Sequence, residues 1–201
     1  SAYLAQRAGH DITVYESAAV VGGHTRTREV DYGGVPIAVD TGFIVFNMQN
    51  YPNLVGFFEH LGVTTQKSDM SFAISMDRGR FEWGARSLSA VFGQRINLLR
   101  PSFYRMIRDV ARFNREAIVR TEQSPTLTLG ELLKALNVGE DFCRYYILPM
   151  GGAIWSAPTE TILDFPAYTF VQFFKNHGLL SFTGQHQWYT VTGGSRQYVE
   201  K

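Results

Sequence analysis

A carboxylate followed closely by a double glycine most constrains how this chain can fold. The β-type run His10-Asp-Ile-Thr-Val-Tyr-Glu16 ends in an acid, and Gly22 and Gly23 come shortly after it. In a dinucleotide-binding fold, an acid at the end of the second strand accepts hydrogen bonds from ribose hydroxyls. Glycines lack a Cβ and let the backbone approach a pyrophosphate closely. The stretch therefore predicts part of a dinucleotide-binding βαβ unit.

The glycine fingerprint of such a unit should lie about 20 residues before the acid, and only 15 residues precede Glu16. Residues 1–8 have the pattern of a helix that Gly9 ends. We therefore expect a chain that begins inside its first βαβ unit, without the first strand and the fingerprint. The expected fold class is α/β, with a partial Rossmann-like FAD/NAD(P)-binding domain and an α+β substrate domain.

Three motifs near the start carry a resemblance to a known family. Val14-Tyr-Glu16 resembles its ribose-binding acid, and Gly22-Gly-His-Thr-Arg-Thr27 resembles its G-G-R-x-x-[ST] motif. Val39-Asp-Thr-Gly-Phe-Ile44, with residues 53–63, resembles the strand and helix that follow near the flavin. In this order the motifs resemble the flavin-containing amine oxidase superfamily, which includes monoamine oxidases, protoporphyrinogen oxidases and phytoene desaturases. The resemblance implies an FAD-dependent oxidoreductase.

Later segments resemble one bacterial branch of predicted NAD/FAD-binding proteins, related to the N-terminal region of plant cyclopropane fatty acid synthases. They are residues 149–158, 163–167, 176–178 and 190–196. This resemblance implies a fatty-acyl or lipid substrate that passes a hydride to flavin, and a lipid methyltransferase as partner. The alternatives are a flavin-dependent amine oxidase and a non-catalytic flavin- or lipid-binding accessory domain. The implied regions are FAD-binding (1–47), substrate-binding (48–190) and a return to the FAD-binding domain (191–201).

The resemblance also implies the residues that contact FAD. Glu16 offers two acceptor oxygens to the ribose diol, and Arg26 offers a guanidinium to phosphate. The predicted set is Glu16, Gly22, Gly23, His24, Thr25, Arg26, Thr27, Asp40, Thr41, Gly42 and Phe43. The alternatives are a surface acid for Glu16, a plain turn for the glycines, a surface cation for Arg26, a turn-closing Asp40 and a core Phe43.

His24 departs from the family pattern, which usually has Arg at this position. Arginine is a permanent, forked cation, whereas histidine with its ordinary pKa of about 6.5 is mostly neutral at pH 7. Arg26 is the candidate to supply the missing charge.

The catalytic residues stay unknown from the sequence. No nucleophile–base signature or metal-ligand spacing is evident, and Cys143 is the single cysteine. Flavin oxidations need few reacting side chains, because the cofactor accepts the hydride. Trp155, in a predicted loop over residues 149–158, is either a pocket wall or a packing residue. His177 is expected to be a cation at a helix C-terminus.

An arginine-rich region covers residues 78–120. It holds ten arginines and three acids, Glu82, Asp109 and Glu116, giving +10 − 3 = +7. One interpretation is a surface for anionic phospholipid headgroups or an acidic carrier protein. The other is a solvated helix face with its aromatic residues turned inward. The net charge of the whole chain is only +1, which gives no bias toward nucleic acid.

The sequence shows no signal peptide and no apolar run of about 18 residues. We therefore expect a cytoplasmic protein, peripheral at the membrane if the arginine-rich region contacts lipid.

The remaining pattern predicts mainly helices, with short hairpins between them. Turns at Gly33-Gly34 and at Asp77-Arg-Gly79 predict two hairpins. Pro101 predicts the start of a long helix to about residue 121, and Thr128 with Glu131 forms a capping-box pattern. Further helices are expected over 54–61 with Asn53 as N-cap, over 140–148 until Pro149, and over 166–176. Strands are expected over 63–68 and 187–192.

Overall fold

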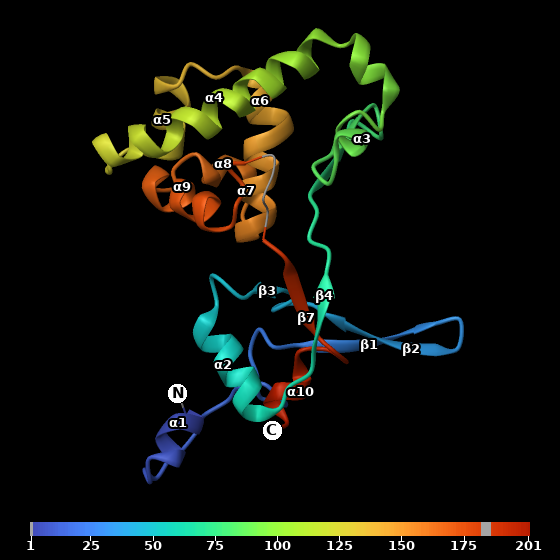
Figure 1. Cartoon of the computed structure of the whole chain (residues 1–201), viewed down its shortest axis with the longest axis vertical. Helices are drawn as coiled ribbons and strands as arrows, with labels where there is room; N and C mark the ends of the chain where they lie inside the picture. The colour runs from blue at the N-terminus through green and yellow to red at the C-terminus, as the bar shows by residue number, and fades with distance from the viewer. Residues whose placement is uncertain (1, 182–185) are drawn as a thin grey trace. The chain divides into compact units, whose positions relative to one another are not determined.

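The chain forms two compact units in the computed structural model, which describes residues 2–181 and 186–201 (Figure 1). The first unit joins Ser1–Ser68 to Trp188–Lys201, and the second is Asp69–Gln187. Ser1 of the predicted first helix and residues 182–185 of the predicted substrate region lie outside the described residues. The predicted regions 1–47, 48–190 and 191–201 were defined by function and not by compactness, so these two units do not test them and they stay predictions.

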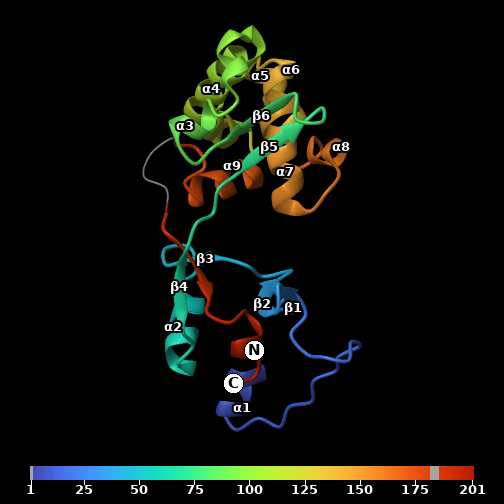
Figure 2. The same ribbon diagram turned by 90° about the vertical axis from the view of Figure 1, so that its right-hand side faces the viewer.

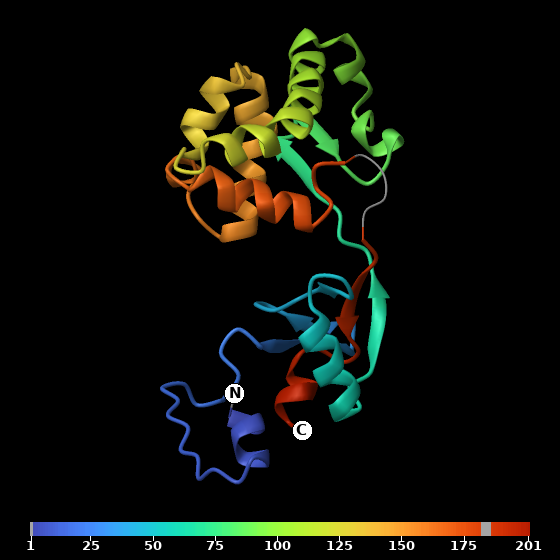
Figure 3. The ribbon, with the colours of Figure 1, turned by 60° about the vertical axis from the view of Figure 1, so that its left-hand side comes forward.

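The first unit holds two small antiparallel sheets, of order β1-β2 and β3-β7-β4. Its elements are α1 (Ala2–Arg7), β1 (Thr27–Tyr32), β2 (Val35–Asp40), β3 (Phe46–Asn47), α2 (Pro52–Leu61), β4 (Thr65–Ser68), β7 (Trp188–Val191) and α10 (Arg196–Val199). Strand β7, which returns late in the chain, therefore pairs with two strands of the first 68 residues (Figure 3).

A small aromatic core joins α2 to this three-stranded sheet. Phe46 of β3 and Phe58 of α2 are buried and meet edge to face, with ring centroids 5.3 Å apart. Tyr198 of α10 lies against Phe58 at 5.0 Å. The C-terminal residues therefore belong to the same core as α2, because their aromatic side chain is packed into it.

The second unit is mainly helical and has one hairpin (Figure 2). Its elements are β5 (Ala73–Met76), β6 (Phe81–Gly84), α3 (Leu88–Val91), the 3₁₀ helix η1 (Arg95–Leu99), α4 (Pro101–Gln123), α5 (Leu129–Ala135), α6 (Glu140–Phe142), the π-helix η2 (Cys143–Ile147), α7 (Leu148–Trp155), α8 (Thr159–Ile162) and α9 (Ala167–Asn176). The buried face of α4 carries Phe103, Met106, Val110 and Phe113, and forms the middle of the core.

Most sequence-predicted elements of both units are confirmed. The two hairpins form with glycines in the left-handed region at their turns, and α4 begins at Pro101. The capping box of α5 is complete, because the Thr128 hydroxyl accepts from the Glu131 amide and the Glu131 carboxylate accepts from the Thr128 amide. The predicted cap of α2 is wrong: the N-cap is Tyr51, whose side chain makes no capping hydrogen bond to the helix, and the helix begins at Pro52.

Pro149 does not end a helix, contrary to the prediction. The chain stays helical through α6, η2 and α7 up to Trp155, so residues 148–155 are not a loop either. A proline inside an α-helix removes one N–H bond and presses on the carbonyl four residues earlier. The wider π-turn over Cys143–Ile147 ends just before α7 and changes the hydrogen-bond spacing there, so Pro149 falls in the first turn of α7, where a proline is tolerated.

The predicted β-type run before Glu16 is not a strand in the structure. Residues 10–16 carry no regular secondary structure, and none of the described strands pairs with them. An extended segment becomes a strand only when a neighbour pairs with its backbone. The chain is mixed α and β as expected, whereas the Rossmann-like sheet stays a prediction.

Thr128→Ala should lower the free energy of unfolding by about 1 kcal/mol, because it removes the acceptor for an N-terminal amide of α5. Urea denaturation followed by circular dichroism measures the change. Thr126→Ala is the control, because Thr126 is exposed and forms no side-chain hydrogen bond in the described residues. Equal losses in both variants would contradict the capping role.

Candidate functional site

Three segments of the first unit meet at the Asp40 carboxylate. It accepts hydrogen bonds from the Thr27 hydroxyl at 2.6 Å and from the Ser195 hydroxyl at 2.8 Å. The Ser195 amide also donates to both carboxylate oxygens at 2.9 Å. The Arg196 amide in turn donates to the Thr27 hydroxyl at 3.0 Å. We call this group of Thr27, Asp40 and Ser195 the Asp40 clamp.

Two glycines allow the backbone of these segments to come this close. A Cβ on Gly42 would overlap the His24 carbonyl oxygen, and one on Gly194 would overlap the Thr27 side chain. Gly194 also has a φ of +93°, which L side chains rarely adopt. Both positions therefore require glycine for the segments to meet.

Further contacts fasten the loop of residues 22–27 to its neighbours. The Thr41 amide and hydroxyl both donate to the Arg26 carbonyl, at 2.9 and 3.1 Å, and the Phe43 amide donates to the His24 carbonyl at 2.8 Å. The Thr25 and Tyr198 hydroxyls are hydrogen-bonded to each other. The loop is thus held from one side by residues 41–43 and from the other by α10.

Donors on this fastened loop stay free. The Gly23 and His24 amides and the Arg26 guanidinium donate no hydrogen bond within residues 2–181 and 186–201. Gly22, Gly23, His24 and Arg26 are exposed, and both glycines have positive φ. Adjacent free amides in a left-handed turn form an anion-binding concavity, and a guanidinium adds a permanent charge. The loop is therefore equipped to bind a phosphate.

The other predicted cofactor residues differ in what holds them. Glu16 is exposed and accepts from the Ala18 amide at 2.8 Å, and no contact joins it to the 22–27 loop in the described part of the chain. Phe43 packs beside Tyr198 at the edge of the aromatic core, with ring centroids 6.4 Å apart. Direct contact of these residues with a cofactor stays a prediction.

Ser195 and Tyr198 were missed as site residues by the sequence reasoning. The sequence does carry a signal for them, because a second double glycine, Gly193-Gly194, directly precedes Ser195. A second double glycine predicts a tight turn, but it does not predict which segment that turn contacts. Only the fold shows that this turn meets Asp40.

In the second unit, Trp155 packs among Phe165, Phe170 and Phe173, with ring centroids 4.9 to 5.1 Å apart, which supports its packing interpretation. His177 follows α9 and stacks on Phe173 at 3.8 Å. Burial lowers the pKa of His177, while the hydrogen bond to the Phe173 carbonyl acts in the opposite direction. Its role as a cation at the helix end stays a prediction.

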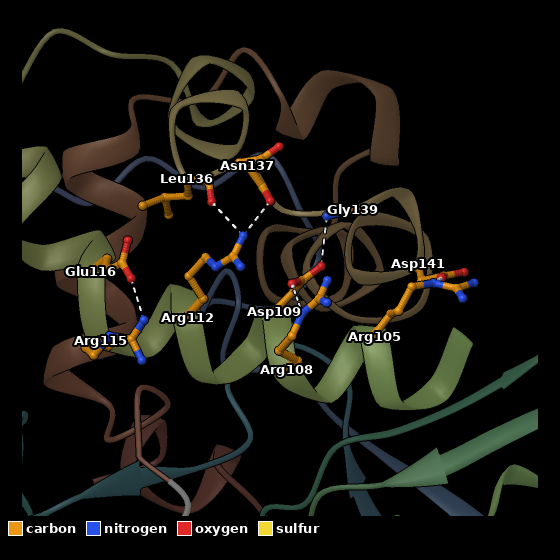
Figure 4. Close-up of polar contacts among 10 residues, drawn as sticks. All are labelled: Arg105, Arg108, Asp109, Arg112, Arg115, Glu116, Leu136, Asn137, Gly139 and Asp141. Atoms are coloured by element: carbon orange, nitrogen blue, oxygen red, sulfur yellow. Dashed lines mark hydrogen bonds and ion pairs between the residues drawn. The ribbon is translucent and has the colours of Figure 1, made fainter. Parts of the chain in front are cut away.

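Most arginines of the 78–120 region are bound within the second unit. Arg105 pairs with Asp141 at 2.8 Å, and Arg112 donates to the Asn137 carbonyl at 2.7 Å, beyond the end of α5 (Figure 4). Arg108 pairs with the buried Asp109, which also accepts from the Gly139 amide at 2.9 Å. Arg78, Arg80, Arg95 and Arg120 have no such partner among the described residues.

Neither a metal cluster nor a membrane-spanning helix is found in the described ranges 2–181 and 186–201. There, no group of three or more His, Cys, Asp and Glu side chains could hold a metal ion. None of the described helices is both long enough and apolar enough to cross a bilayer.

Comparison with known proteins gives one result for the whole chain. The sequence model of a family described as flavin containing amine oxidoreductase matches residues 1–201. No curated protein matches.

Asp40→Ala should lower the free energy of unfolding of the first unit by about 2 kcal/mol or more, since it leaves the Thr27 and Ser195 donors without their charged acceptor. The measurements are urea denaturation and hydrogen exchange at the Ser195 amide, which should become faster. Asp11→Ala is the control, because Asp11 is exposed and has no partner in the described residues. Unchanged exchange at Ser195 would contradict the clamp.

Gly42→Ala should lower the free energy of unfolding by about 1–3 kcal/mol, because the added methyl group presses on the His24 carbonyl and must displace the 22–27 loop. Gly56→Ala is the matched control. Gly56 lies inside α2 with open space around it, so alanine there should be neutral or stabilise the helix by about 0.5–1 kcal/mol. Thermal denaturation of the two variants should therefore shift in different directions.

Proposed function

The chain belongs to the family of flavin-containing amine oxidoreductases, and we propose that its 22–27 loop binds the diphosphate of FAD. The observation that carries the proposal is the set of free donors on this loop, the Gly23 and His24 amides and the Arg26 guanidinium. A diphosphate supplies only acceptors, which these donors match. The residues present therefore fit the group.

The contacts around the loop suit a cofactor-binding role. The Asp40 clamp and the Thr41 and Phe43 bonds fix the loop backbone before any ligand arrives. A preordered loop loses less conformational entropy on binding. Glu16 would bind the ribose diol, because one of its carboxylate oxygens has no partner in the described structure.

A bound FAD would supply a hydride acceptor, so that a substrate could lose a hydride to the flavin and a proton to solvent and be left with a C=C or C=N bond. The residues of this chain then bind and orient the cofactor. The family resemblance places the Gly42 region beside the cofactor ring, although the space that a Cβ of Gly42 would take is filled by the His24 carbonyl. Arg26 is exposed and carries a permanent guanidinium charge, so it would supply positive charge beside the diphosphate.

The proposed substrate is a fatty-acyl or lipid chain. Its support is the resemblance of residues 149–158 and 190–196 to the branch related to cyclopropane fatty acid synthases. A lipid methyltransferase is the proposed partner on the same ground. An amine is the second candidate substrate, because the matching family is described by amine oxidoreduction.

The first test is the visible spectrum of the native protein that contains these residues, with identification of any released cofactor. We expect a flavin spectrum and FAD. Anaerobic mixing with phospholipids or with amines should then bleach the flavin for the true substrate class. A protein that is colourless and takes up no added FAD would refute the oxidoreductase, and lipid binding by such a protein would indicate the accessory-domain alternative.

Arg26→Gln and Glu16→Gln should each weaken FAD binding roughly tenfold, the effect of losing one charge-assisted hydrogen bond. Titration of the apoprotein with FAD, followed by flavin fluorescence, measures this. Asp11→Asn is the control, since it removes a nearby exposed charge without touching the loop. If all three variants bind alike, the donors and the acid are not the binding groups.

A further inference from the structure

Four large apolar side chains lie exposed where η1 meets α4. Ile96, Leu98, Leu99 and Tyr104 are 49%, 43%, 79% and 49% exposed. Leu98, Leu99 and Tyr104 line a shallow surface hollow of about 470 Å³, together with Pro101, Arg105 and Arg108. Scattered exposed leucines are ordinary, but a contiguous apolar patch edged by charge marks an interaction surface.

This patch is held rigidly by its own neighbours. Asn97 is fully buried between the exposed residues, and its amide nitrogen donates to the Glu82 carbonyl at 2.8 Å. Arg100 donates to the Asn97 side-chain oxygen at 2.9 Å, and Tyr104 donates to the Leu98 carbonyl at 3.0 Å. The buried anchor keeps η1 in a conformation that exposes the apolar residues on either side of it.

The charge around the patch is positive. Residues 95–108 include four arginines, Arg95, Arg100, Arg105 and Arg108, and no acid. Arg105 forms an ion pair with Asp141, and Arg108 forms one with Asp109 (Figure 4). Arg100 lies over the Phe81 ring and donates a hydrogen bond to Asn97. Arg95 is exposed and has no partner in the described residues. The side chains of Arg105 and Arg108 remain more than half exposed.

We infer that this surface, formed by Ile96, Leu98, Leu99, Tyr104 and Arg95, docks the protein on an anionic phospholipid bilayer. The aliphatic side chains enter the boundary between headgroups and acyl chains, the tyrosine lies at headgroup level, and the arginines meet the phosphates. This is the arrangement of interfacial membrane binding, in which buried apolar area and attraction to anionic lipid add. The inference does not rest on FAD binding, because every residue in it belongs to the second unit.

The test is cosedimentation of the full chain with vesicles of phosphatidylcholine alone and of phosphatidylcholine with phosphatidylglycerol. We expect binding to the anionic vesicles that falls steeply with salt. Leu99→Asp should weaken it at least about tenfold, because it places a charge in the apolar contact. Val119→Asp is the matched control, since Val119 is an exposed α4 residue outside the surface and should change binding little.

Arg95→Gln and Arg120→Gln form a second matched pair, because each removes one exposed arginine without a partner among the described residues. Arg95→Gln should weaken vesicle binding several-fold and Arg120→Gln should not. Circular dichroism checks the fold of each variant.

The inference is overturned if anionic vesicles do not bind, if neutral vesicles bind as well, or if a variant and its control lose binding equally. Binding to soluble acidic protein in place of vesicles also overturns it. A protein that binds vesicles but no flavin would refute only the proposed function. A protein that binds flavin but no anionic vesicles would refute only the docking surface.

Discussion

The first unit depends on one carboxylate that joins three distant segments. Asp40 ends β2, Thr27 begins β1 and Ser195 precedes α10, and the Asp40 carboxylate accepts from the Thr27 and Ser195 hydroxyls and from the Ser195 amide at 2.6 to 2.9 Å. A carboxylate makes stronger hydrogen bonds than a neutral acceptor, and this group holds Thr27, at the end of the 22–27 loop, beside Asp40 and Ser195. The free donors on that loop are useful for binding only because its backbone is already fixed.

Glycines and prolines made much of the fold predictable from the sequence. Gly33 takes a left-handed conformation at a predicted turn, and Gly62 and Gly178 take one shortly after the helices predicted over 54–61 and 166–176. Thr128 caps α5 as its spacing with Glu131 predicts. These features are local, because a few adjacent residues determine them. The prediction for Pro149 was wrong because the effect of this proline depends on the preceding π-turn, which no single residue predicts.

The candidate site was predictable in its parts and not in its assembly. The residues of the 22–27 loop and of 40–43 were identified by motif, while Ser195 and Tyr198 entered only because the chain returns through β7. The predicted strand before Glu16 did not form, since a strand needs a partner that a sequence pattern cannot supply. Long-range pairing is therefore what the sequence could not show here.

The arginines of the second unit fall into two groups, those with a partner inside the unit and those without one among the described residues. Arg112 is bound to backbone carbonyls beyond the end of α5, where helix carbonyls lack partners and a cation is favourable. Asp109, fully buried, has Arg108 beside it and the Gly139 amide as a donor, so its charge is compensated inside the unit. Arg95 has neither kind of partner among the described residues, and it lies next to exposed aliphatic side chains. Most of the ten arginines of 78–120 therefore bind groups within the helical unit, and of the four without such a partner among the described residues, Arg95 lies beside uncovered apolar side chains.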